Sequence, residues 1–523
     1  MKKLLLLFIV LSGLNLYASN QNFVKIDSSN NITSVAHAVR VIKAFYGPML
    51  YFENRYFFMN TNNANSMGFY ANGFNSSLYF QSHNLLNLSR NYKVKNYRNS
   101  NYVGIFAGYS HLSNLGSSNL EENNRYEIGL FDIQNPANKQ MGQLTKLHVF
   151  GTLSNIKFNI GRFTPGPTPF INNQDGRLRP TFVQGINVEY KRDSLPFGIK
   201  ATAVFNLANQ ILARGSNDWK SINQTIGLYP MGLNIYGKNS NYSNSIRSNN
   251  VLLFPSLSLS KTKERKALVK NEDKDSFYLI KTLNVDLNYN LVYLNTLFTT
   301  QMIELTGKSK LNRTKSILND DISTLSYGLM WIHQKSNAVN SDTNYIEASA
   351  KSNVFSAFLS AEKELGLWLY QFTLATTRIT KDGRYLMPRE WGRDPFYTFM
   401  ARERNEGFGD LTAWTIDAQI SRRFRTNKYL LRNISYKLGF GNYKLPDVKN
   451  YVYNKYGMPS YQQLNTMVSM NFIDKRMKNN LSIQVWYVQK FNAGNTYNQL
   501  KYEQNKVNMN QLNIILNYSL NIY

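Results

Sequence analysis

Three charged side chains at alternate positions of one short segment are the residues best placed to do chemistry: Asp175, Arg177 and Arg179. An arginine guanidinium donates two parallel hydrogen bonds to a carboxylate. Such side chains can therefore bind a charged solute or pair with one another. Four prolines between positions 165 and 180 restrict the backbone around them. We therefore expect a constrained loop that holds its charges in fixed places.

A second charged cluster lies between residues 387 and 410, where four arginines accompany five carboxylates. It can bind carboxylates at the mouth of a channel, or it can satisfy its own charges as a salt-bridge network that holds a surface loop. The sequence leaves both interpretations open. The arginines are Arg389, Arg393, Arg402 and Arg404.

Catalytic and metal chemistry have little support in the sequence. The chain has no cysteine, which excludes thiolate metal sites, cysteine nucleophiles and a disulfide-stapled scaffold. Its five histidines are scattered without a pair at metal-binding spacing, and no GxSxG, HExxH or P-loop motif occurs. We therefore expect no enzyme, no metal and no other cofactor.

The elements that flank the Asp175 cluster show the alternation of β-strands. Apolar residues recur at every second position from Leu147 to Leu153 and again from Ile156 to Ile160, on either side of a turn at Ser154 and Asn155. This pattern predicts a hairpin. The cluster then lies in the loop between that hairpin and the next strand, near Ile186.

Composition indicates how the strands are used. Residues 1–18 have two lysines, a short apolar run and a terminal alanine, which is typical of a cleaved secretory signal. The remaining chain is rich in Tyr, Phe and Asn at a mean hydropathy of −0.40. An exported, polar, aromatic-rich chain of strands is typical of a membrane β-barrel, because only alternate residues meet lipid. The formal net charge of +28 favours anionic partners, either lipid headgroups or solutes.

Strand patterns from the two ends give the expected size of the barrel. We count seven strands from Leu50 to Phe205 and eight from Leu325 to the C-terminus. The last of these eight shows a clear alternation of apolar and polar residues. The middle, residues 207–321, offers four candidates: 222–235, 251–259, 277–291 and 293–303. An even total requires an odd number of these, and three give eighteen antiparallel strands. Long connections at 60–76, 112–143 and 163–184 then become the first three outer loops, so the Asp175 segment is the third.

In each strand, alternate residues face the lipid and the lumen, and we call the two sets the outward and the lumenal (polar) parity. Charged residues on the polar parity of these strands are expected to face water in the lumen. Placing Lys or Arg on the lipid face costs about 2–4 kcal/mol at the bilayer midplane. The lumenal candidates are Arg55, Lys157, Lys191, Lys200, Asp417 and Arg423, with Glu53, Glu189 and Asp286 on the same parity.

The third-loop region resembles that of OprD-type outer-membrane porins. The similarity rests on Asp175 to Phe182, DGRLRPTF, with Gly161-Arg162, Gly185 and the preceding hairpin. The stretch LYFENRYFFMN from Leu50 also resembles their first strand, and the basic, asparagine-rich, cysteine-free composition resembles the Hof-type porins of Helicobacter and relatives. The resemblance implies an eighteen-stranded barrel whose third loop folds inward and whose basic lumen guides small, often carboxylate-bearing solutes.

Carried to this chain, the resemblance implies that Asp175, Arg177 and Arg179 line a constriction or brace the loop against the barrel wall. We expect a signal peptide at 1–18, an N-terminal extension at 19–48 that lies in the periplasm or in the lumen and can form a short helix, and a β-barrel porin domain at 49–523. Expected partners are small hydrophilic solutes, outer-membrane lipids and the barrel assembly machinery, which would read the C-terminal strand, but no nucleic acid. The chain is a monomer or a homotrimer, in the Gram-negative outer membrane. The alternative function is an adhesin that binds anionic glycans through basic loops.

Overall fold

The computed structural model describes residues 48–64, 66–82, 85–87, 101–118, 130–132, 138–166, 168–171, 177–213, 216–226, 232–240, 251–270, 276–295, 297–314, 320–337, 346–347, 350–391, 394–402, 405–424, 430–474, 479–503 and 507–521. The expected signal peptide and the extension up to residue 47 lie outside these residues.

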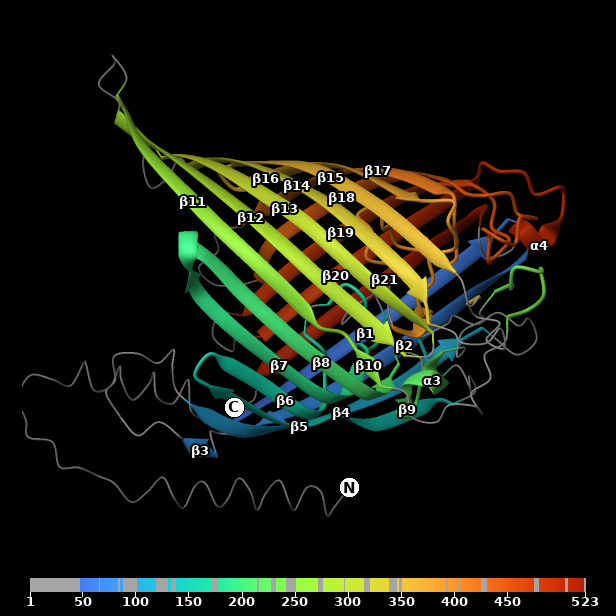
Figure 1. The fold of residues 1–523 in the computed structure, drawn as a ribbon, viewed down its shortest axis with the longest axis horizontal. Helices are drawn as coiled ribbons and strands as arrows, with labels where there is room; N and C mark the ends of the chain where they lie inside the picture. The colour runs from blue at the N-terminus through green and yellow to red at the C-terminus, as the bar shows by residue number, and fades with distance from the viewer. Residues whose placement is uncertain are drawn as a thin grey trace, which may run out of the picture. The chain divides into compact units, whose positions relative to one another are not determined.

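Eighteen long antiparallel strands form one closed barrel (Figure 1). The sheet has twenty-one strands in the described residues, of which β3 (Leu86–Asn87), β9 (Lys220–Ser221) and β10 (Leu252–Leu253) span two residues each. β1 pairs with β21 from Tyr51↔Asn521 to Asn63↔Met509, which closes the ring. The long strands are β1 (Met49–Asn63), β2 (Ser66–Gln81), β4 (Tyr102–Ser117), β5 (Gln140–Leu153), β6 (Ile156–Phe163), β7 (Phe182–Leu195), β8 (Ile199–Leu212), β11 (Ser256–Lys270), β12 (Ser276–Leu294), β13 (Phe298–Thr314), β14 (Asp320–Ser336), β15 (Lys351–Leu365), β16 (Trp368–Ile379), β17 (Leu411–Arg423), β18 (Leu430–Lys444), β19 (Tyr461–Asp474), β20 (Asn479–Asn492) and β21 (Met509–Asn521).

Side chains alternate between a lipid-facing exterior and a polar interior. On β14 and β15, Leu325, Leu329, Phe355 and Leu359 are all 45–57% exposed, as expected of an apolar surface that meets acyl chains rather than a protein core. A closed barrel pairs every backbone donor and acceptor of its strands, so it can cross a bilayer. In the described part of the chain, no helix is long and apolar enough to do so.

The expected strand total is confirmed, and the middle of the barrel is now defined. β11, β12 and β13 are the three strands that the count required. The candidate at 222–235 was wrong: α3 (Ile222–Thr225) begins there, and no strand covers the described residues 222–226 and 232–235. The basic stretch after Lys261 is not a connection, because β11 continues through it to Lys270.

The first expected loop, at residues 60–76, was also wrong. β1 and β2 remain paired up to Asn63↔Ser66, so these residues form the upper part of a hairpin. Their sequence is rich in Asn, Ser and Thr on both faces. Above the lipid belt neither face needs to be apolar, so the period of two that marks a membrane strand is not visible there.

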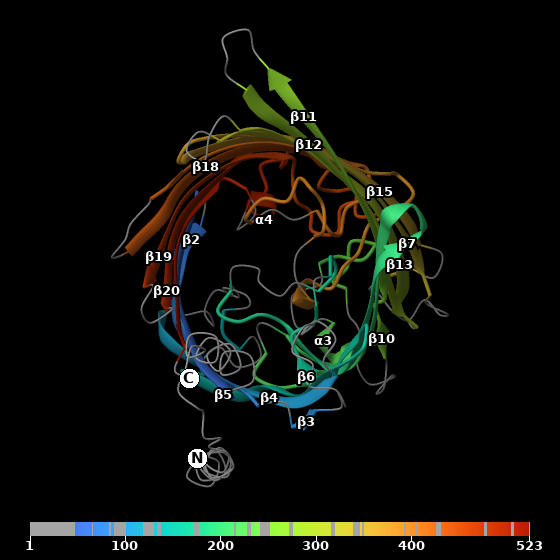
Figure 2. The same ribbon diagram turned by 90° about the vertical axis from the view of Figure 1, so that its left-hand side faces the viewer.

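The longer connections gather at one end of the barrel, and the short turns at the other, where β21 ends (Figure 1). Viewed along the barrel, several connections fold inside the ring of strands (Figure 2). They carry an internal apolar core, in which Phe170 and Ile171 of the third loop belong to the same buried cluster as Trp391 and Phe396 of the loop between β16 and β17. The lumen is therefore partly filled by two inward-folded loops.

Candidate functional site: a charged lumen narrowed by two loops

The third loop, residues 164–181, is also anchored inside the barrel by the apolar side chain of Leu178. Leu178 is buried among Phe57, Phe131 and Ile515 in a cluster built on β1, β2, β4 and β21. Burying a leucine side chain contributes about 1.5–3 kcal/mol. The adjacent charged residues are thus held against the wall, at a fixed height in the lumen.

The two arginines beside Leu178 lie in different environments. Arg179 is 2% exposed, and its Nη2 donates a hydrogen bond of 3.4 Å to the carbonyl oxygen of Ala213, at the end of β8. Arg177 is only half-buried and lines a lumenal cavity. Arg179 therefore has the geometry of a brace and Arg177 that of a contact for solutes. Asp175 lies outside the described residues.

This cavity, of about 1050 Å³, is strongly basic. It lies between the third loop and the walls formed by β1 and β17–β21, and residues near the short-turn ends of these strands line it. Of the described charged residues that line it, six are cationic and one, Glu53, is acidic. The cationic residues are Arg55, Lys146, Arg177, Arg179, Arg423 and Arg432.

The two predicted strand arginines in this cavity are held by polar partners. Arg55 Nη1 donates to Asn517 Oδ1 at 3.0 Å, across the β1–β21 pair that closes the barrel. Arg423 Nη1 lies 2.6 Å from Glu364 Oε1 on β15. These contacts fix the guanidinium groups, so the positive charge of the wall has a defined position.

A second cavity, of about 840 Å³, lies between the third loop and the loop that joins β16 and β17. Its charged lining is mainly acidic: Glu189, Glu304 and Asp394 accompany Lys191. Tyr397 of the loop donates to Glu304 Oε1 on β13 at 2.6 Å. The two cavities therefore have opposite charge.

The remaining predicted lumenal residues are on the expected face but outside the basic cavity. Lys191 pairs with Glu189 at 2.8 Å, and Lys157 lies 4.0 Å from the same carboxylate. Asp417 pairs with Lys437 at 3.2 Å. Lys200 is exposed and lies opposite Ser260 of β11. Of the six predicted residues, the structure thus brings only Arg55 and Arg423 together around one cavity.

The second predicted cluster belongs to the loop between β16 and β17, residues 380–410. Arg393 and Arg404 lie outside the described residues, and of Arg389 only the backbone, in a 3-10 turn, is described. Arg402 is half-buried, and its carbonyl oxygen accepts a hydrogen bond of 2.6 Å from Lys490.

Two carboxylates of this loop accept hydrogen bonds from its own backbone and from a neighbouring loop. Asp394 accepts hydrogen bonds from the backbone of Asn405 and Glu406, and Glu406 accepts one from the hydroxyl of Tyr456. The loop is therefore a folded unit, held by its own backbone and by the neighbouring loop between β18 and β19.

Arg384, a residue that the sequence did not single out, ties four connections together. It is 4% exposed, pairs with Glu347 at 2.9 Å, and donates to the carbonyl oxygens of Leu233 and Tyr451. Burial lowers the pKa of its guanidinium, and the carboxylate of Glu347 opposes this shift. The outer connections are thus joined to one another rather than separate.

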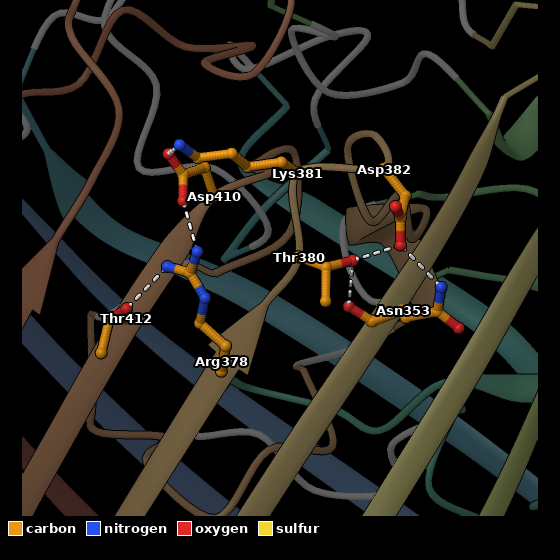
Figure 3. A network of polar contacts seen from close by, with 7 residues as sticks. All are labelled: Asn353, Arg378, Thr380, Lys381, Asp382, Asp410 and Thr412. Atoms are coloured by element: carbon orange, nitrogen blue, oxygen red, sulfur yellow. Dashed lines mark hydrogen bonds and ion pairs between the residues drawn. The ribbon is translucent and has the colours of Figure 1, made fainter.

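A polar clasp closes the base of the same loop (Figure 3). Arg378 Nη2 lies 2.5 Å from Asp410 Oδ1 and Lys381 Nζ lies 3.5 Å from Asp410 Oδ2, which joins the two ends of the loop. Beside it, Asp382 accepts hydrogen bonds from Thr380 at 2.7 Å and Asn353 at 2.8 Å. These two bonds lower the pKa of Asp382.

Two cationic residues of the basic cavity were missed from the sequence, for different reasons. Lys146 lies on the polar parity of β5, so the alternation with Leu147 could have identified it. Its Nζ is 4.4 Å from the ring centroid of Tyr79. Arg432 could not have been found, because a bulge between Leu431 and Asn433 breaks the period of two on β18.

No metal site is evident in the described residues, which hold no suitable group of three His, Asp or Glu side chains. A scan against protein-family models found no match, and a search of curated proteins found no similar sequence.

Solved structures, by contrast, match the whole barrel. Acinetobacter baumannii OccAB2 has a TM-score of 0.59 at 11% sequence identity, over 91% of this chain and 98% of that one. Pseudomonas aeruginosa OpdK, solved with vanillate, has a TM-score of 0.57 at 13% identity, over 91% and 100%. P. aeruginosa OccK2, solved with glucuronate, has a TM-score of 0.54 at 11% identity, over 92% and 100%.

The resemblance to OprD-type porins is thus confirmed at the level of the fold, and the similarity to Hof-type porins stays a prediction. The predicted localisation agrees with this fold and with the lipid-facing exterior. The chain has the β-barrel fold of the Occ and OpdK channels.

Proposed function

We propose that this protein is a porin through which small hydrophilic solutes diffuse passively, with a preference for anionic or carboxylate-bearing ones. The observation that carries the proposal is the basic cavity beside the third loop, in which six cationic side chains accompany one carboxylate. Rings of fixed cations in a narrow pore favour anions.

The arrangement of these cations supports recognition as well as attraction. Arg177 offers its guanidinium to the cavity from the third loop, while Arg55 and Arg423 offer theirs from the opposite walls. A carboxylate that passes between them can exchange one bidentate partner for the next. Two channels with the same fold were solved with carboxylate-bearing compounds, vanillate and glucuronate, which is consistent with this chemistry.

Planar-bilayer recording tests the proposal. The reversal potential in a salt gradient should show anion preference, and Arg177→Gln should reduce this preference. Arg192→Gln is the control, because Arg192 is exposed on the outward parity of β7 and is not among the residues that line the basic cavity. Cation selectivity, or no conductance from the folded protein, contradicts the proposal.

The adhesin alternative makes a different prediction. It requires exposed cations on the outer loops to capture anionic glycans. Among the described outer-loop cations, Arg384 is buried and paired with Glu347, whereas Lys381 is exposed. Trimming the outer loops abolishes heparin binding by an adhesin but leaves a porin conducting. We propose no catalytic step for this barrel.

A further inference from the structure

The outer wall of the barrel has a hollow of about 670 Å³ on the face that meets lipid. Large apolar side chains border it: Leu311, Leu325, Tyr370, Phe372 and Ile420 are 40–47% exposed and lie on the outward parity of β13–β17. Smaller residues, Ser309, Ala361 and Ala418, form its floor. A hollow between large and small side chains of a lipid-facing wall has the shape to hold an acyl chain.

The hollow has a cationic end. Across the strands, Lys281 lies opposite Leu311, Leu311 opposite Ser323, and Ser323 opposite Lys363. Lys363 Nζ donates to Ser323 Oγ at 3.2 Å, so this ammonium group already lies over the wall. The Cα atoms of the two lysines are separated by three strand spacings, about 14 Å. Two side chains of this length can reach one anion placed over Leu311 and Ser323.

A second observation points to an anion at the same place. Lys281 lies directly opposite Arg265 on the outward face of the β11–β12 hairpin, which extends past its neighbours at the short-turn end (Figure 1). Like charges directly opposed across a strand pair are destabilising unless an anion lies between them. The acidic residues Glu264, Asp286, Glu304, Glu362, Glu364 and Asp417 lie on the lumenal parity of these strands. Asp321, at the start of β14, has the outward parity and lies opposite Arg313 of β13.

The height of this cationic end matches a lipid headgroup. Trp368 and Tyr436 are 39% and 47% exposed at the short-turn end of the same wall, and Arg422 stacks over Trp368 at 5.1 Å from the ring centroid. Aromatic residues of this kind mark the membrane–water interface of barrels, and the short turns are periplasmic. β14 begins at the short-turn end and runs toward the membrane centre, so Leu325 lies deeper in the membrane than Ser323. The apolar part of the hollow therefore lies deeper than the two lysines.

We propose that this hollow is a binding site for an anionic phospholipid of the periplasmic leaflet. The phosphate lies between Lys281 and Lys363 and accepts hydrogen bonds from both ammonium groups, and one acyl chain lies over Ala361 and Ala418. This site is separate from the lumen and independent of the proposed solute preference.

Native mass spectrometry of the full-length, detergent-solubilised protein tests the site. Phosphatidylglycerol is titrated against phosphatidylethanolamine with the same acyl chains. The wild type should retain phosphatidylglycerol in preference. The double variant Lys281→Gln/Lys363→Gln should lose this preference by about thirtyfold, because each of the two lysines near an anionic headgroup contributes about 1 kcal/mol.

Two further variants distinguish the contribution of the lysine charges to lipid retention from that of the apolar groove. Lys308→Gln/Lys310→Gln removes the same charge from the lumenal parity of β13 and should leave retention unchanged. Ala361→Phe keeps every charge but fills the floor, and it should reduce retention of phosphatidylglycerol. Heat-modifiable migration on gels confirms that each barrel is folded.

Three results overturn the proposal. They are equal retention of the two lipids by the wild type, equal loss in the lumenal control, and displacement of the lipid by glycerol 3-phosphate alone, which would show an anion site without an acyl-chain groove.

Discussion

The hydroxyl group of Tyr397 donates a hydrogen bond of 2.6 Å to Glu304 Oε1, which joins the loop between β16 and β17 to the wall of β13. These residues are 93 positions apart in sequence. Burial and this hydrogen bond to a carboxylate both raise the pKa of Tyr397, so the phenol remains a donor at neutral pH. The contact holds the inward loop across the acidic cavity.

Tyr397→Phe should therefore loosen this loop. A hydrogen bond to a charged group contributes about 1.5–3 kcal/mol when it is buried, and somewhat less at this half-buried position. We expect more frequent current fluctuations in single-channel recordings, with the barrel still folded. Tyr436→Phe, on the lipid-facing surface, is the matched control. Identical recordings from the two variants would show that the contact does not hold the loop.

The position of the third loop depends on a glycine of β2. A Cβ at position 73 would lie 2.6 Å from Leu178 Cδ1 and 2.9 Å from Phe131 Cε1. Gly73→Val should displace Leu178 and with it Arg177, at a cost of about 1–3 kcal/mol. We expect altered conductance and anion preference. Gly166→Ala, in the same loop with open space around it, should leave both unchanged.

The clasp at the base of the loop between β16 and β17 should weaken in acid. Hydrogen bonds from Thr380 and Asn353 lower the pKa of Asp382 in the folded state. Its contribution to stability is therefore present above the unfolded pKa, about 3.9, and is lost as the pH falls through the lower, folded value. Limited proteolysis near residues 380–384 should accelerate as the pH falls from about 5 to 3.

Asp382→Asn isolates this effect. The variant should be cleaved faster at pH 5 and should show a smaller change between pH 5 and 3 than the wild type. Asp410 of the neighbouring ion pairs also titrates in acid, so the comparison rests on the difference between the two proteins. An unchanged pH response in the variant would assign the acid sensitivity to other carboxylates.

The strands could be predicted because lipid imposes the alternation that reveals them. All fifteen strands expected near the two ends are present, and so is the inward third loop. Outside the lipid belt this constraint disappears. The sequence of the Asn-rich top of the β1–β2 hairpin therefore predicts a loop, although the two strands remain paired there.

The site was less predictable because its geometry depends on contacts between distant segments. The parity of Arg55 and Arg423 gave their lumenal orientation, but nothing local indicates that Arg179 would meet the carbonyl of Ala213 or that Arg384 would be buried against Glu347. Such pairs form only once the loops fold into the barrel.

Arg432 offers the sharpest test of the basic cavity, because it lines this cavity beside a register shift between Leu431 and Asn433 of β18. Arg432→Gln should lower the ratio of anion to cation permeability, since one charge at about 7 Å in water contributes about 0.6 kcal/mol, or roughly threefold. Arg422→Gln removes the same charge from the outer face at the same end of the barrel, where Arg422 stacks on Trp368. Reversal potentials should therefore shift in the first variant and not in the second. Equal shifts would mean that the surface charge of the rim, rather than the lining of the cavity, sets the selectivity.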